Sequence, residues 1–162
     1  MMKQNAQAKI LFTIILAISC LIGCSQQLQK RVDDADSLKQ SLARLNGVYT
    51  WQADIQRYDF SAKSELEKIL SGTPPKQVVE ILIECLDDTS SSASVLNEKR
   101  VFLGIVCYEG LSQLVYYEPT DATGDIDTQW PGFISPTASP QEMRNAKTEW
   151  KKAQTTNRLI FQ

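Results

Sequence analysis

The residues of this sequence with the most definite chemistry are its four cysteines, Cys20, Cys24, Cys85 and Cys107. A thiol can be acylated, join a disulfide or bind a metal, and its surroundings decide among these. The chain has no His, which excludes Ser-His-Asp and Cys-His nucleophile systems and His-ligated zinc. The last two thiols, 22 positions apart, are too few for a Cys₄ metal site. We therefore expect no catalytic residue, no metal and no cofactor.

The first two cysteines belong to the amino-terminal segment. The chain opens with the polar stretch MMKQNAQAK, whose only charges are Lys3 and Lys9, and continues with the apolar run ILFTIILAISCLIG. A positive start, an apolar run and small residues are the layout of a secretory signal. As a helix the run would be about 21 Å long, shorter than the roughly 30 Å hydrocarbon core of a membrane. A permanent transmembrane helix is therefore disfavoured.

The end of this run, Leu21-Ile22-Gly23-Cys24, resembles the lipobox of bacterial lipoproteins. The resemblance implies that Cys24 receives a diacylglyceryl group, that residues 1–23 are removed as a signal peptide, and that the new amino terminus is acylated, for instance with palmitate. Cys20 fits the motif less well, because Ala17 replaces the usual Leu and cleavage there would leave an apolar stub. We assign lipidation to Cys24. The alternative is an ordinary cleaved signal with incidental cysteines.

The resemblance also bears on location. In enterobacterial lipoproteins, Asp directly after the lipidated Cys tends to retain the protein in the inner membrane, and here that position is Ser25. This favours the outer membrane, facing the periplasm. Without residues 1–23 the chain has 15 basic and 19 acidic residues, a net charge of −4. With no basic block, it gives no footprint for nucleic acid. The expected partners are the membrane, through the lipid on Cys24, and an envelope protein.

The remaining chain predicts a polar tether over residues 24–36 and one domain over residues 37–162. Apolar residues spaced by three and four predict helices, although VYTW alone would also suit a strand. The helical stripes are Leu38, Leu42 and Leu45; Val48, Trp51, Ile55 and Tyr58; Val78, Ile81, Leu82 and Cys85; Cys107, Leu111, Leu114 and Tyr117; and Met143, Ala146 and Trp150. Capping signals are Ser64 with Glu67, Thr73, and Ser139 with Glu142.

These stripes predict a mostly α fold: a small helical bundle or helical hairpins, with one long loop over residues 119–139. The stretch VLNEKRVFL is compatible with a short β-hairpin turning at residues 97–100. The segments VVEILIECLDD and GIVCYEGLSQLVYY resemble one HEAT-type helical hairpin, a likeness carried by Leu82, Leu86, Asp88, Val106 and Leu111. It implies a helical binding module, but arrays of that kind need several stacked units, and this chain has one.

Cys85 and Cys107 predict a disulfide in an oxidising periplasm. Cys85 lies in the last turn of one predicted helix and Cys107 in the first turns of the next. If the two helices pack antiparallel, those ends are neighbours. The alternative is two buried thiols that never meet.

Two acidic stretches are candidate sites. Glu80, Glu84, Asp87 and Asp88 gather at one helix end, and paired carboxylates can hydrolyse glycosides. The alternative is structural, with Asp87 and Asp88 capping the next loop.

The second stretch alternates Asp121, Thr123, Asp125 and Asp127 like the start of a calcium loop. Ile126 and Gly132 occupy the places where such a loop needs Gly and Glu. We therefore predict a solvated acidic loop and no metal site.

The long loop also carries Trp130 and Phe133, which we predict as the partner-binding residues, because Trp is enriched at interface hot spots. The alternative is that Trp130 folds back onto the last helix near Trp150 and closes the core. Trp51 and Trp150 are predicted to be core, and Glu109 to face solvent or pair with a basic residue.

The functional hypothesis is therefore an outer-membrane lipoprotein with a small helical protein-binding domain, in a scaffold, assembly, inhibitor or immunity role. It is predicted not to be an enzyme. The alternative is a peptidoglycan-acting hydrolase that uses carboxylates.

Overall fold

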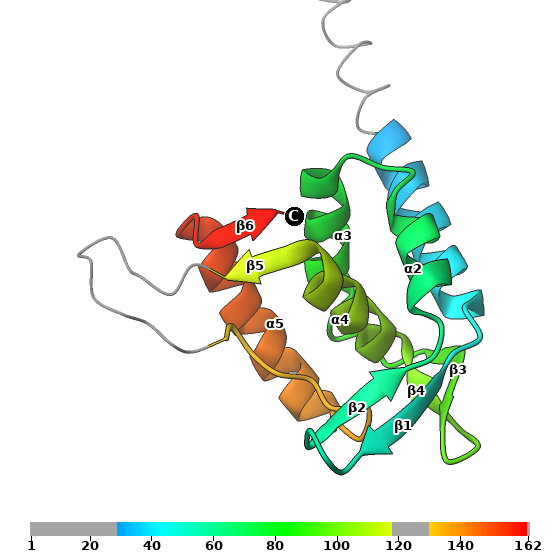
Figure 1. Ribbon diagram of the computed structural model, residues 1–162. Helices are drawn as coiled ribbons and strands as arrows, with labels where there is room; N and C mark the ends of the chain where they lie inside the picture. The colour runs from blue at the N-terminus through cyan, green and yellow to red at the C-terminus, as the bar shows by residue number, and fades with distance from the viewer. Residues whose placement is uncertain (1–28, 118–129, 162) are drawn as a thin grey trace, which may run out of the picture. The chain divides into compact units, whose positions relative to one another are not determined.

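The computed structural model describes residues 29–117 and 130–161 (Figure 1). The chain divides into two compact units, Met1–Ser37 and Leu38–Gln162. A helix over residues 29–44 begins in the first unit, so residues 29–36 are helical where the sequence predicts a polar tether. In these described ranges, no helix combines the length and the apolar character that crossing a membrane requires.

The second unit is an α+β domain, so the prediction of a mostly α fold is wrong. Its helices after residue 44 are α2 (Lys63–Leu70), α3 (Pro75–Cys85), α4 (Leu103–Leu114) and α5 (Pro140–Thr155). Its strands are β1 (Val48–Gln52), β2 (Arg57–Phe60), β3 (Ser91–Leu96), β4 (Lys99–Phe102), β5 (Val115–Tyr117) and β6 (Leu159–Phe161). The first four form a mixed sheet in the order β2-β1-β3-β4, and β5 pairs antiparallel with β6.

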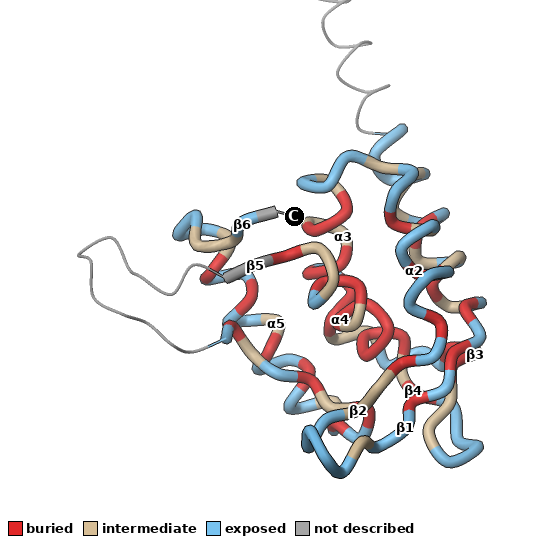
Figure 2. The backbone as a smooth tube through the Cα atoms, in the orientation of Figure 1, coloured by how far each residue is buried: buried red, intermediate tan, exposed pale blue. Residues whose placement is uncertain are grey.

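Helix α4 is the centre of this unit. It packs against α2, α3, β3 and β4, and its backbone is buried along most of its length (Figure 2). The four-stranded sheet lies at one end of the helices, and α5 lies on the side of α3 and α4 away from α2 (Figure 1). Gly104 allows the start of α4 to pack closely against the main chain at Leu86. A Cβ at this position would stand 2.3 Å from the main-chain oxygen of Leu86.

The β1–β2 hairpin replaces a predicted helix. The spacing of Trp51 and Tyr58 also fits two strands, and the two residues are paired across the hairpin with their rings 5.1 Å apart. Alternation in β1 places Tyr49 on the same face as Trp51, where Tyr49 is 4% exposed in the core. Trp51, predicted to be core, is 51% exposed because β1 has passed the edge of the core at that point.

Strand β3 falls where the polar stretch DDTSSSAS predicts a loop. Ser92 and Ser94 are buried, and each hydroxyl has a main-chain acceptor: Ser92 donates to the oxygen of Val101 at 2.9 Å, and Ser94 to that of Leu45 at 2.7 Å. A buried hydroxyl is tolerated when it is hydrogen-bonded. The hairpin prediction is confirmed, with a two-residue turn at Asn97 and Glu98, whose φ angles are 49° and 66°.

The capping signals have mixed outcomes. The capping box of Ser139 and Glu142 is confirmed at the start of α5. Ser64 lies inside α2, whose N-cap is Ala62, and α3 begins after Pro74 without a cap from Thr73. These two predictions are wrong because α2 begins two residues before, and α3 one residue after, the position that its sequence signal gives.

Candidate functional site

The residues that follow the long loop are fixed to the helices by Tyr108. Its hydroxyl accepts a hydrogen bond from Trp130 Nε1 at 3.1 Å. Burial raises the pKa of Tyr108 to about 12, although Trp130 and the main chain of Ile134 partly offset the effect. The hydrogen bond ties the end of the loop to α4.

Trp150 supports the same segment from α5. It is fully buried, as predicted, and its Nε1 donates to the oxygen of Gly132 at 2.9 Å. The ring of Trp130 stands edge-on to that of Trp150, with centroids 5.2 Å apart. Trp130 is 37% exposed. It thus lies beside Trp150, as the alternative prediction has it, while keeping part of its surface open.

Among the aromatic residues of the described ranges whose ring contacts another aromatic ring, Phe133 is the most exposed. It is 67% exposed, and its ring lies edge-on to Tyr108 at 5.8 Å. Gly132 next to it has a φ of +127° and lies against α5, where a Cβ would meet the Cα of Ala146 at 2.8 Å. Because its neighbours Pro131 and Ile134 are buried, Phe133 is presented on a segment fixed at both sides.

Beside Phe133 lies a hollow of about 380 Å³. It is bounded by the β1–β2 hairpin, the start of α2, α4 and residues 133–136. Its polar lining comes from three separate elements: Tyr49 and Arg57 from the hairpin, Lys63 from α2, and Glu109, Ser112 and Gln113 from α4. The sequence brings none of these elements together by spacing alone.

Glu109 is the acidic residue in the lining of this hollow. Burial raises the pKa of its carboxyl, and the positive charges of Lys63 and Arg57 only partly offset the effect. The residue is half-buried, and within the described ranges it makes no ion pair with a basic residue, so it lies between its two predicted settings. The pKa of Tyr49 is raised well above its ordinary value by burial and by the negative charge of Glu109.

Two residues that line the hollow each have a polar atom without a hydrogen-bond partner among the described residues. The two atoms are the hydroxyl of Tyr49 and Nε2 of Gln113, and both are buried. The Gln113 amide favours the ionised form of Glu109, but its Nε2 does not reach hydrogen-bonding geometry. Buried polar groups are nearly always paired, so two unpaired ones in one hollow call for a physical reason.

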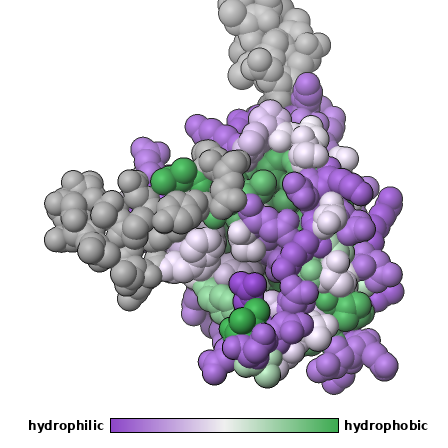
Figure 3. All heavy atoms as spheres, in the orientation of Figure 1, coloured by the Kyte–Doolittle hydropathy of each residue, from purple (hydrophilic) through white to green (hydrophobic). Residues whose placement is uncertain are grey.

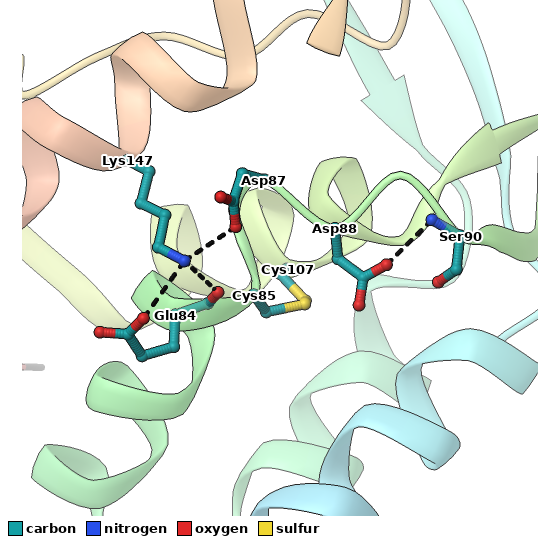
Figure 4. The surroundings of a disulfide bond; sticks show 7 residues. All are labelled: Glu84, Cys85, Asp87, Asp88, Ser90, Cys107 and Lys147. Atoms are coloured by element: carbon teal, nitrogen blue, oxygen red, sulfur yellow. Dashed lines mark hydrogen bonds and ion pairs between the residues drawn. A yellow bond between two sulfur atoms is a disulfide. The ribbon is translucent and has the colours of Figure 1, made fainter. Parts of the chain in front are cut away.

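The acidic end of α3 is an ion-pair cluster (Figure 4). Lys147 of α5 reaches Oδ1 of Asp87 at 2.8 Å, Oε2 of Glu84 at 3.2 Å and the main-chain oxygen of Glu84 at 2.6 Å. Lys151 pairs with the other carboxylate oxygen of Glu84 at 2.8 Å. A cation at the carboxyl end of a helix also complements its dipole. Asp88 accepts from the N–H of Ser90 at 2.9 Å, which confirms its predicted role in capping the loop.

This pairing decides the chemistry of the cluster. A hydrogen bond from Lys151 lowers the pKa of Glu84, and one from Lys147 lowers that of Asp87. A general acid near neutral pH needs the opposite shift. The two carboxylates therefore lack the raised pKa that a general acid requires.

We expect Lys147→Met to lower the free energy of unfolding by about 1–2 kcal/mol at pH 7, because its charge is shared by three acceptors. The matched change Lys151→Met should cost about 0–1 kcal/mol, since that side chain is 46% exposed and makes one ion pair. Denaturant unfolding of both variants measures the difference.

The effect of Lys147→Met should depend on pH. The pKa values of Asp87 and Glu84 are lowered on folding, so their contribution is complete above their ordinary values of 3.8 and 4.5 and is lost as the pH falls further. The pKa of Lys147 is raised by its hydrogen bonds to these carboxylates, against the effect of burial, so its contribution persists up to its ordinary value of 10.5. The difference from wild type should shrink towards pH 3, and an equal loss at pH 7 and pH 3 would contradict an ionic origin.

The remaining predicted site residues fall into two groups. The sulfur atoms of Cys85 and Cys107 are 1.97 Å apart, so the structure places the two cysteines at disulfide distance, in line with the prediction. Cys20, Cys24 and the acidic residues 121–127 lie outside the described residues. Within the described ranges, no group of His, Cys, Asp and Glu side chains could hold a metal ion.

Comparisons with known proteins add no relative. No protein-family model matches the chain. No curated protein and no solved structure matches it either. A functional assignment therefore rests on the geometry of the domain and on the sequence motifs.

Sequence reasoning missed Tyr49 and Tyr108 as site residues. Tyr49 stands in a strand that was predicted as helix, which hid its alternation with Trp51. Tyr108 lies on an apolar helix, where an aromatic residue predicts only core. The one available signal was the neighbouring Glu109, an acid in the most apolar helix of the domain.

Proposed function

We propose that this chain is a lipid-anchored protein of the bacterial envelope whose folded domain binds another envelope protein. The lipobox at Cys24 supports the anchor, and Ser25 supports the outer membrane, facing the periplasm. We assign this binding to a scaffold, assembly, inhibitor or immunity role. The surface of the domain supports contact with a protein better than it supports a reaction.

The observation that carries the binding role is the presentation of Phe133. The residue is 67% exposed, although Tyr108, Gly132 and the buried Ile134 fix its position. A rigid exposed aromatic residue loses little conformational entropy on binding, and aromatic residues are enriched at interface cores. The visible face of the domain is otherwise mostly hydrophilic, with its hydrophobic residues in separate patches (Figure 3).

The ion pairs of Glu84 and Asp87 favour this hypothesis over a carboxylate-based hydrolase. Their lowered pKa values suit anions held by Lys147 and Lys151 and do not suit a proton donor.

The test is site-specific photocrosslinking in the native envelope. A photoreactive phenylalanine analogue placed at Phe133 should form a discrete adduct with one envelope protein. The same analogue at Lys68, which is exposed on α2, is the matched control and should not form that adduct. Equal adducts from both positions, or none from either, would contradict a partner site at Phe133.

We further expect Phe133→Ala to reduce partner capture at least tenfold while changing the free energy of unfolding by less than about 0.5 kcal/mol, as for an exposed side chain. Trp130→Ala should cost about 2 kcal/mol of stability, because it removes the edge-on contact with Trp150 and the hydrogen bond to Tyr108. Thermal unfolding with quantitative capture separates the two effects. A stability loss from Phe133→Ala as large as that from Trp130→Ala would make Phe133 a core residue.

A further inference from the structure

We propose that the hollow between the β1–β2 hairpin, α4 and residues 133–136 is a binding site for a small zwitterion, an amino acid or a short peptide. Glu109 holds its ammonium group and Arg57 its carboxylate. This site is a function in addition to the proposed capture of a protein partner.

The first support is the pair of unpaired polar groups. Tyr49 is 4% exposed, yet its hydroxyl has no hydrogen-bond partner among the described residues, and the same holds for Nε2 of Gln113. Leaving a buried donor unpaired costs about 1–3 kcal/mol. Both residues line the hollow. The polar oxygen atoms of a ligand in the hollow can serve as acceptors for the two groups.

The second support is the charge of the lining. Glu109 and Arg57 have opposite charges and both line the hollow, but no ion pair joins them in the described part of the chain. Lys63 is already held by Asp59, with 2.6 Å between Nζ and Oδ1. Two opposite charges that line one hollow without pairing with each other are complementary to a molecule that carries one charge of each sign.

The size of the hollow and its apolar walls also support a small ligand. A hollow of about 380 Å³ is near the lower end of the roughly 300–1,000 Å³ typical of ligand pockets. The remaining walls are apolar or aromatic, formed by Tyr58, Ile105, Tyr108, Phe133, Ile134 and Pro136. They offer contact for the carbon atoms of a small ligand, and the ammonium group can also lie against an aromatic face.

The experiment is calorimetric titration of the full chain in detergent with charged and blocked probes. Alanine, alanyl-alanine and trialanine carry both charges at increasing separation. N-acetyl-alanine lacks the ammonium group, and alaninamide lacks the carboxylate. We expect at least one of the three zwitterions to bind at least tenfold more tightly than either blocked probe, and the preferred length distinguishes a free amino acid from a peptide.

Three variants locate the binding. Glu109→Gln should remove the preference for a free ammonium group, and Arg57→Gln the preference for a free carboxylate. Tyr49→Phe should lower the affinity severalfold without lowering the melting temperature, because it removes a hydroxyl that is unpaired in the free protein. Arg100→Gln, an exposed charge on β4, is the matched control and should change neither property.

The outcomes are distinct from those of the crosslinking test. Equal binding of alaninamide and the zwitterions would overturn the proposal in favour of a cation site, and equal binding of N-acetyl-alanine in favour of an anion site. No binding of any probe at millimolar concentration would also overturn it. Each of these results leaves a protein partner at Phe133 unaffected.

Discussion

Changing Cys24 to Ser is expected to abolish fatty-acid labelling of the protein and to leave a precursor that keeps residues 1–23. The physical reason is the chemistry of the side chain: a Ser hydroxyl does not replace the thiol that accepts the diacylglyceryl group in lipoproteins with this motif. Metabolic labelling with radioactive palmitate, together with the gel mobility of the two forms, measures both effects.

The anchor itself should also be lost. Each buried CH₂ contributes about 0.8 kcal/mol, and stable attachment takes more than one acyl chain. The Cys24→Ser protein therefore depends on its uncleaved apolar run for membrane association. As a helix, that run is shorter than the hydrocarbon core of a membrane. Cys20→Ser is the control and should be labelled and processed like wild type. Label that persists in Cys24→Ser and disappears in Cys20→Ser would assign lipidation to the other cysteine.

Local signals predicted part of the fold because the physics behind them is local. Ser139 and Glu142 satisfy each other's main-chain donors within one turn, so the start of α5 is visible in four letters. The apolar stripes of α3 and α4 likewise follow from residues a few positions apart. Hence the two helices, and the position of a cysteine on each, could be predicted without knowledge of the rest of the domain.

The sheet was missed because its signals are not local. Val48, Trp51, Ile55 and Tyr58 recur at helical spacing, and only pairing between β1 and β2 decides that Trp51 faces Tyr58 across a hairpin. Strand β3 is polar in sequence, and its buried serines are acceptable only because Leu45 and Val101 accept their hydroxyl protons. Such partners lie up to 49 positions away.

The candidate site was missed for the same reason. The sequence identifies Trp130 and Phe133 only as large aromatic residues in a long loop. Whether Trp130 binds a partner or packs near Trp150 depends on where Trp150 lies, which the sequence does not give. The hollow joins a strand, two helices and a loop, and none of the charged residues in it belongs to a motif. Only Glu109 stood out, as an acid on an apolar helix.

Loss of the disulfide should have the largest effect on stability within the domain. Cys85 ends α3, Cys107 lies in α4, and their Cα atoms are 6.0 Å apart, within the usual range for a disulfide. The bond closes the segment that contains the β3–β4 hairpin. By the chain-entropy estimate, a closed loop of this size contributes about 3 kcal/mol, a large share of the roughly 5–15 kcal/mol that holds a typical domain together.

The double variant Cys85→Ala, Cys107→Ala should therefore unfold at a markedly lower urea concentration than the oxidised wild type. Ala is the suitable replacement, because both positions are fully buried and Ser would place an unpaired hydroxyl there. Adding a reductant should lower the midpoint of wild type towards that of the variant and leave the variant unchanged. Thiol titration of the unfolded, non-reduced wild type should find neither Cys85 nor Cys107 free. Two reactive thiols in that sample, or a midpoint insensitive to the reductant, would show that α3 and α4 are held together by packing alone.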